Sequence, residues 1–150
     1  MTDITQFLSK FFPFIGAFVS LNTFDRGQYS LGIRQFVKIG LIPLALLATI
    51  RHIVFNGSII KNQTFFEFEA GGTNLGIAIA TIFALYKGLG NDSFGIIFLI
   101  YGIYLAMGMM AWTLYHPHKT TLKLLSFLSI SCLLFYYAYV SFTKKDKKKD

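Results

Sequence analysis

Four apolar segments of membrane-spanning length determine the kind of fold that this chain can adopt. They cover residues 36–55, 69–87, 94–115 and 122–142. Each is close to the roughly 20 residues that an α-helix needs to cross about 30 Å of hydrocarbon. A spanning segment must also pair its own backbone groups, which favours helices. The sequence therefore predicts an all-α integral membrane protein with a four-helix bundle over residues 36–142.

The composition agrees with a chain that folds in a bilayer. Hydrophobic residues make up 54% of the 150 residues, whereas only 14% are charged. So few charged side chains do not cover a water-facing surface. The net charge is +7, but the basic residues do not form the aromatic-interleaved face that binds nucleic acid. We therefore expect membrane lipids among the partners, and no nucleic acid.

The two ends of the chain lie outside this bundle. Residues 1–35 contain an apolar stretch, 4–21, that is interrupted by Lys10 and Pro13. This stretch is compatible with a fifth span, a re-entrant segment or a helix that lies in the membrane interface. Residues 143–150 are rich in lysine, and we expect them to form a disordered basic tail.

The distribution of basic residues predicts the orientation in the membrane. If the C-terminus is cytoplasmic, four spans place nine basic residues on the cytoplasmic side and four on the other side. Because basic residues concentrate on the cytoplasmic side, we predict a multi-pass protein with a cytoplasmic C-terminus. Tyr136, Tyr137 and Tyr139 directly precede the lysines, and we expect them to form an aromatic belt at the same interface.

Polar residues at the start of the second apolar segment are the main candidates for a site. Glu67, Glu69 and Asn74 lie there, and Arg51 and His52 lie near the end of the first segment. Consecutive spans run in opposite directions, so these five residues are expected at similar depth near the non-cytoplasmic side. Carboxylates and amides are costly in lipid unless they face a partner or a cavity. The cluster is either a charge-paired clamp between two helices or a polar pocket.

Small residues recur every four positions along the same second segment. They are Gly72, Gly76, Ala80 and Ala84. Such a stripe lets the backbone of a neighbouring helix approach closely, and van der Waals contact then drives association in lipid. The stripe predicts helix packing, either within the chain or with a partner.

His116 and His118 follow the third apolar segment and are weak candidates for metal ligands. They flank Pro117 and are expected on the same side of the membrane as the glutamates. This spacing is not diagnostic of any metal, and we predict no metal site.

The order of polar and small residues in the first two segments resembles an uncharacterised family of small prokaryotic integral membrane proteins, which are DoxX-like in general shape. The resemblance covers about residues 36–134. It rests on His52, Glu69, Gly71, Asn74, Leu75 and Gly76, with a loose match at His116. Arg51 departs from the small residue expected before the histidine. The resemblance implies a four-helix membrane fold and the same polar site, and it implies no reaction.

Three functions are compatible with these features. The first is an accessory or assembly subunit, or a binder of a lipophilic small molecule such as a lipid or a quinone, within a larger membrane complex or a homo-oligomer. The second is a membrane enzyme for a lipid or quinone-like substrate, with His52 or Glu69 as the acid–base group and Asn74 or Arg51 stabilising an oxyanion. The third is a proton or ion pathway, which requires polar residues through the whole bilayer. We expect the first, which is not enzymatic.

Overall fold

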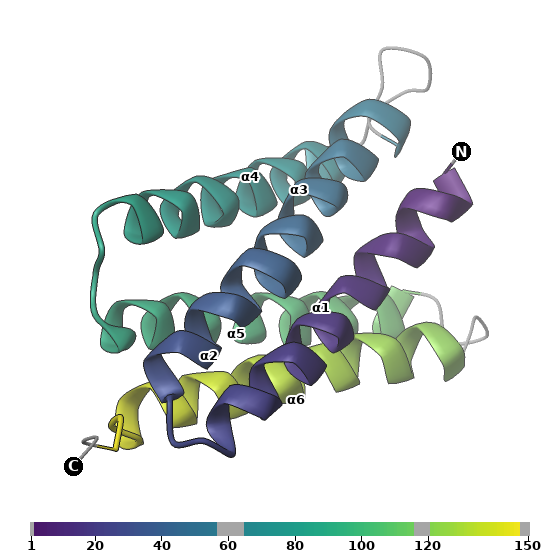
Figure 1. The fold of residues 1–150 in the computed structure, drawn as a ribbon. Coiled ribbons are helices and arrows are strands. Elements are labelled where there is room, and N and C mark those ends of the chain that lie inside the picture. Colours follow the sequence, from purple (N-terminus) through teal and green to yellow (C-terminus); the bar gives the residue numbers. More distant parts are fainter. Residues whose placement is uncertain (1, 57–64, 116–120, 148–150) are drawn as a thin grey trace.

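A computed structural model of the protein describes residues 2–56, 65–115 and 121–147, and these residues are helical apart from short turns and the last residues before 148 (Figure 1). The helices are α1 (Thr2–Phe24), α2 (Tyr29–Phe36), η1 (Val37–Leu41), α3 (Ile42–Ile50), η2 (Arg51–Asn56), α4 (Phe65–Tyr86), α5 (Asn91–Tyr115) and α6 (Thr121–Thr143). The segments η1 and η2 are π-helical, and α2, η1, α3 and η2 follow one another without a break. The predicted all-α fold is confirmed.

Three helices are long and apolar enough to cross a membrane. They are Tyr29–Val54, Asn91–Ala111 and Leu124–Thr143. The apolar part of α1 is shorter and covers Leu8–Phe24. The described residues therefore contain three candidate spans, as a multi-pass membrane protein requires.

The helices run alongside one another and have two distinct ends (Figure 1). At one end lie the turn between α1 and α2, the turn between α4 and α5, and the C-terminus; we call this the C-terminal end. The N-terminus lies at the other end. Helices α5 and α6 form a tightly packed pair, and α4 lies against α3 and η2.

The first span begins earlier than the sequence predicts. It was expected to start at residue 36, but the helix starts at Tyr29 because the preceding turn ends there. Gly27 has φ 71°, a left-handed conformation that glycine adopts readily. Ile33 and Phe36 then face the core, and both are fully buried. Arg34, which precedes the predicted start at residue 36, is therefore part of the helix.

The other spans differ from the predicted bounds at their ends. Helix α4 begins at Phe65 instead of residue 69, α5 at Asn91 instead of residue 94, and α6 covers Thr121–Thr143 instead of 122–142. Asn91 and Asp92 belong to the first turn of α5, where polar and acidic residues suit the free amides of a helix N-terminus. Such polar first turns are not visible to a reading that looks for apolar runs.

Residues 4–21 belong to a fifth helix that packs into the bundle. Helix α1 runs along η1 and α3 and forms a hairpin with α2 (Figure 1). The two backbones approach closely at Gly16, where an added Cβ would lie 2.8 Å from the backbone nitrogen of Gly40. Gly40 belongs to the π-helical turn that precedes Pro43, a residue that has no N–H to donate within a helix. The segment is thus a helix packed along the others, and whether it spans the membrane, re-enters it or lies in its interface stays open.

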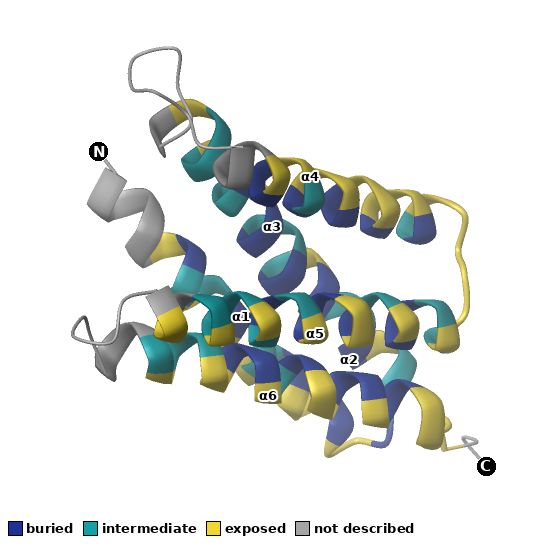
Figure 2. Cartoon of the chain, turned by 180° about the vertical axis from the view of Figure 1, so that it is seen from behind, coloured by how far each residue is buried: buried dark blue, intermediate teal, exposed yellow. Residues whose placement is uncertain are grey.

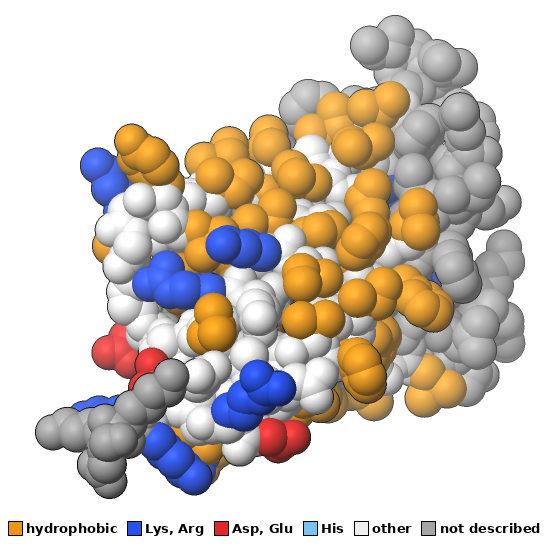
Figure 3. Space-filling view, viewed as in Figure 1, with side chains coloured by type: hydrophobic (Ala, Val, Ile, Leu, Met, Phe, Trp, Pro, Cys, Tyr) orange, Lys and Arg blue, Asp and Glu red, His pale blue; other side chains and the backbone are white. Residues whose placement is uncertain are grey.

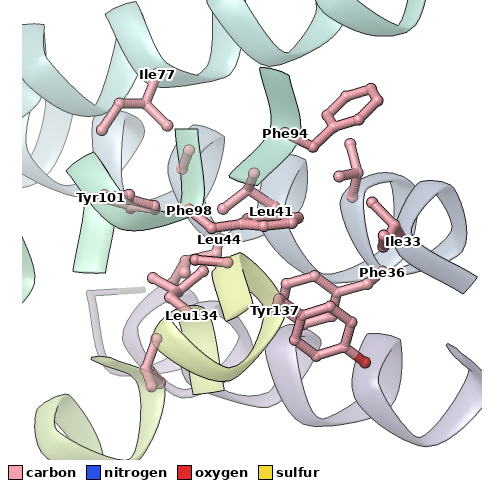
Figure 4. Close-up of a cluster of buried hydrophobic side chains, with 14 of the residues drawn as sticks. Ile33, Phe36, Leu41, Leu44, Ile77, Phe94, Phe98, Tyr101, Leu134 and Tyr137 are labelled. Carbon is pink, nitrogen blue, oxygen red and sulfur yellow. The ribbon is translucent and has the colours of Figure 1, made fainter. Parts of the chain in front are cut away.

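The core contains an aromatic cluster of Phe24, Phe36, Phe98 and Tyr137, of which Figure 4 labels the last three. The Phe36 and Tyr137 rings are stacked, with centroids 3.7 Å apart and planes 9° apart. The Phe98 ring meets the Tyr137 ring edge-on at 5.8 Å. The Tyr137 hydroxyl is hydrogen-bonded to the hydroxyl of Ser20 on α1. The expected aromatic belt is therefore wrong for Tyr137, because 3.6 residues per turn place it on the buried side of α6.

The first residues after α6 are held against the turn between α1 and α2. The Ser30 amide donates a hydrogen bond to Asp146 Oδ1 at 2.8 Å, and the Lys147 amide donates to the Gly27 carbonyl at 3.1 Å. Asp146 thereby caps a free amide at the start of α2, where a negative charge also suits the helix dipole. The expectation of a disordered tail from residue 143 is wrong for residues 143–147, and residues 148–150 lie outside the described residues.

Candidate functional site

The centre of the candidate site is Asn74, which is buried on the face of α4 that looks toward α5. The Tyr101 hydroxyl donates a hydrogen bond to Asn74 Oδ1 at 2.5 Å. Asn74 Nδ2 donates to the carbonyl of Ala70, one turn earlier, at 2.7 Å. Asn74 is 2% exposed and Tyr101 is fully buried. The amide thus has both a donor and an acceptor partner inside the bundle.

Two further hydroxyl groups extend this polar region across three helices. The Tyr104 hydroxyl, one turn after Tyr101 on α5, lies 3.4 Å from the carbonyl of Ala70. Thr49 on α3 donates to the Ala45 carbonyl at 2.9 Å, and its hydroxyl lies 3.5 Å from the carbonyl of Gly71. We call Thr49, Asn74, Tyr101 and Tyr104 the polar core; it joins α3, α4 and α5.

The described residues show where several members of the predicted polar cluster lie. A Cβ added at Gly71 would lie 3.4 Å from Cβ of His52 and 2.4 Å from Cγ1 of Ile53, so η2 meets α4 within one turn of Asn74. Arg51 and His52 are half-buried, whereas Glu69 is exposed. The backbone of Glu67 belongs to α4, and its side chain lies outside the described part. The predictions for His116 and His118 also lie outside the described residues.

The small residues of α4 divide between two environments. Gly72, Gly76 and Ala80 are exposed, and a Cβ at either glycine would meet nothing within 4 Å. Ala84 is buried. The face of α4 that packs inside the bundle contains Gly71, Asn74, Ala78 and Thr81 instead. Figure 2 shows the exposed positions as a yellow band along α4.

The main residue missing from the predicted cluster is Tyr101. The sequence shows it as one aromatic among several in α5, and its hydroxyl distinguishes it only when a partner is sought for Asn74. A buried amide needs an acceptor and a donor, so a hydroxyl halfway along another span was the signal to look for. Thr49 gives a weaker signal, because threonine often bonds to the carbonyl four residues earlier in its own helix.

The chemistry of the polar core is that of helix-to-helix bonding. The Tyr101 hydroxyl joins α5 to Asn74 on α4, whereas Thr81 donates to the carbonyl of Ile77 at 2.6 Å within α4 itself. Among the described residues, His, Cys, Asp and Glu do not form a group of three or more that could hold a metal ion. The arrangement fixes α5 against α4 at a point well inside both helices.

We expect the bond between Asn74 and Tyr101 to contribute measurably to stability. Tyr101→Phe leaves Asn74 Oδ1 without its donor, and should lower the free energy of unfolding by about 1 kcal/mol, a usual size for such bonds in membranes. In a cycle with Asn74→Ala, the double variant should lose less than the sum of the single losses. Unfolding in mixed micelles with increasing denaturing detergent measures this. Strictly additive losses would contradict the bond.

No protein-family model, curated protein or solved structure matches the chain. The resemblance to DoxX-like membrane proteins therefore stays a prediction, and the functional argument rests on the geometry of the helices.

Proposed function

We propose that the protein is a non-enzymatic accessory or assembly subunit of a larger membrane complex, and that α4 is the helix that contacts another subunit. The observation that carries this proposal is the exposure of Gly72, Gly76 and Ala80. Small residues at four-residue spacing are the usual contact surface between membrane helices, since they let backbones approach.

One side of helix α4 is exposed, and the other side packs inside the bundle. Its inner side packs on α3 and η2, and its contact with α5 is limited. Its outer side combines the three small residues with exposed Leu75, Ile79 and Phe83. A second transmembrane helix seated on this side would gain van der Waals contact with the backbone at the glycines and with the larger side chains beside them.

The interior supports a structural role more than a reaction or a conduction path. Asn74 is bonded to Tyr101, and Thr81 and Thr49 donate to carbonyls of their own helices. An acid–base site needs a group that can reach a substrate, whereas the amide and hydroxyls of the polar core already bond to the chain itself. The polar core therefore lends no support to an ion pathway, and the enzyme alternative, which uses His52 or Glu69, stays a prediction.

The charge distribution supports a cytoplasmic C-terminal end. The basic residues described at this end are Arg26, Arg34, Lys87, Lys144, Lys145 and Lys147, and the acidic ones are Asp25, Asp92 and Asp146. Figure 3 shows basic side chains on the half of the molecule toward that end. An excess of basic residues next to membrane spans favours the cytoplasmic side, so we place the C-terminus there.

The experiment that tests the proposed role is purification from native membranes in mild detergent, followed by mass spectrometry of the molecules that co-elute. We expect at least one other membrane protein in a fixed ratio to this chain. Elution of the chain alone, or as a homo-oligomer with a bound lipid or quinone, would contradict a role as a subunit of a larger complex and favour the lipophilic-ligand alternative.

The exposed glycines give a sharper version of the test. Gly72→Leu with Gly76→Leu should reduce recovery of the partner at least about tenfold, because loss of close backbone contact costs more than about 1.4 kcal/mol. Both side chains would enter open space in the isolated chain. Gly108→Leu on α5 is the matched control, since a Cβ there also meets nothing within 4 Å. Equal loss of partner from both variants would exclude α4 as the specific contact.

A further inference from the structure

The C-terminal end holds one arginine in a fixed position. Arg34 Nη2 donates a hydrogen bond to the carbonyl of Leu89, in the turn between α4 and α5, at 3.0 Å. Its guanidinium carbon lies 5.6 Å from the ring centroid of Phe94, a fully buried residue at the start of α5. A carbonyl and an aromatic face orient the guanidinium without neutralising its charge.

A lysine lies one turn deeper on the same helix. Lys38 is four residues after Arg34, about 6 Å farther along the axis, and it is exposed. It belongs to the candidate span Tyr29–Val54, and in a bilayer a lysine at such a position lays its stem along lipid and extends its ammonium toward the headgroups. Lys87 is two residues before Leu89, and its ammonium lies 5.7 Å from the ring centroid of Tyr86.

The part of the chain that the structure describes does not neutralise these three cations. Within the described residues, Arg34, Lys38 and Lys87 have no carboxylate within salt-bridge distance. Exposed apolar side chains lie on the same elements, among them Leu31 on α2 and Phe83 on α4. A cationic group at the membrane boundary thus adjoins surface that suits hydrocarbon chains. Figure 3 shows basic side chains set among hydrophobic ones on this face.

We propose that Arg34, Lys38 and Lys87 form a binding site for the headgroup of one anionic phospholipid. The phosphate lies between the fixed guanidinium and the two ammonium groups, and the acyl chains run along the exposed apolar side chains of α2 and α4. Arginine and lysine are the usual partners of phosphate. A lipid fits better than an acidic protein because Lys38 lies on the lipid-facing side of a span, below the level that a soluble partner reaches. The proposal does not depend on the partner subunit inferred for α4.

Native mass spectrometry of the purified full chain tests this site. The delipidated protein is titrated in detergent with phosphatidylglycerol and, separately, with phosphatidylcholine of the same acyl chains. We expect the first phosphatidylglycerol to bind more tightly than the first phosphatidylcholine. Lys38→Gln should weaken binding of phosphatidylglycerol about fivefold, the effect of one basic residue near an anionic surface, and leave binding of phosphatidylcholine unchanged.

A matched variant separates a site from general charge attraction. Lys145→Gln removes the same charge at the same end, from an exposed position beyond α6, and should leave binding of the first phosphatidylglycerol within twofold of the unmodified chain. Arg34→Gln serves as a second site variant and should weaken binding at least as much as Lys38→Gln. Equal weakening by Lys38→Gln and Lys145→Gln would overturn the proposal, and so would equal affinity of the unmodified chain for the two lipids.

Discussion

Replacing Tyr137 with alanine is expected to lower the free energy of unfolding by about 3–5 kcal/mol, the range for removing a buried aromatic side chain. The ring is stacked on Phe36 and meets Phe98 edge-on, so its removal leaves a cavity between α2, α5 and α6. The Ser20 hydroxyl would also lose its partner on α6. Unfolding in mixed micelles, followed by circular dichroism, measures the loss.

The neighbouring tyrosine is the control for this prediction. Tyr136 is 45% exposed on the adjacent position of α6. Tyr136→Ala removes the same number of atoms from a side chain that is nearly half exposed, and should change the free energy of unfolding by less than about 1 kcal/mol. If both variants lose stability equally, the aromatic cluster is not the centre of the core.

Adding a single methyl group at Gly16 is expected to have the second largest effect. In Gly16→Ala the new Cβ would lie 2.8 Å from the backbone nitrogen of Gly40 and 2.9 Å from its Cα. Backbone atoms cannot move aside as a side chain can, so α1 must separate from η1. Overpacking of this kind costs about 1–3 kcal/mol, sometimes more. The readout is the midpoint of detergent-induced unfolding together with protease sensitivity of the α1–α2 turn.

Gly76→Ala provides the opposite result in the same assay. Its Cβ enters open space on α4, and alanine favours a helix over glycine by about 0.5–1 kcal/mol in soluble hosts. This variant should be as stable as the unmodified chain or more stable. Destabilisation by Gly76→Ala comparable to that by Gly16→Ala would mean that the close contact between α1 and η1 is not what limits packing.

The positions of the long helices could be predicted because apolar runs of about 20 residues leave few alternatives in lipid. Their first turns could not be. Asn91 and Asp92 begin α5, and polar and acidic side chains are favoured in a first turn because its backbone amides have no acceptor within the helix. Tyr29 begins its helix after the left-handed Gly27. A search for apolar runs detects neither the polar first turn nor the left-handed glycine.

The sequence could predict that Asn74 belongs to the candidate site, but it could not predict which side chain bonds to Asn74. Asn74 is unusual enough in an apolar helix to be selected from the sequence, and the structure has it buried. Its partner Tyr101 depends on the rotation of α5 about its own axis, which is set by packing with α6 and is not encoded by spacing within α4. The close contact between glycines could not be predicted either. The four-residue spacing of small residues predicts packing on α4, whereas the close contact within the chain joins Gly16 to Gly40, one glycine from each of two helices.

The hydrogen bond from the Ser30 amide to Asp146 has a consequence for the order of events during synthesis. The two residues are 116 positions apart in the chain. At a usual translation rate of about 5–20 residues per second, Asp146 is therefore synthesised roughly 6 to 23 seconds after Ser30. Until Asp146 has followed α6 out of the ribosome, the Ser30 amide lacks this capping partner. The turn between α1 and α2 is thus completed only by a residue that is synthesised after α6.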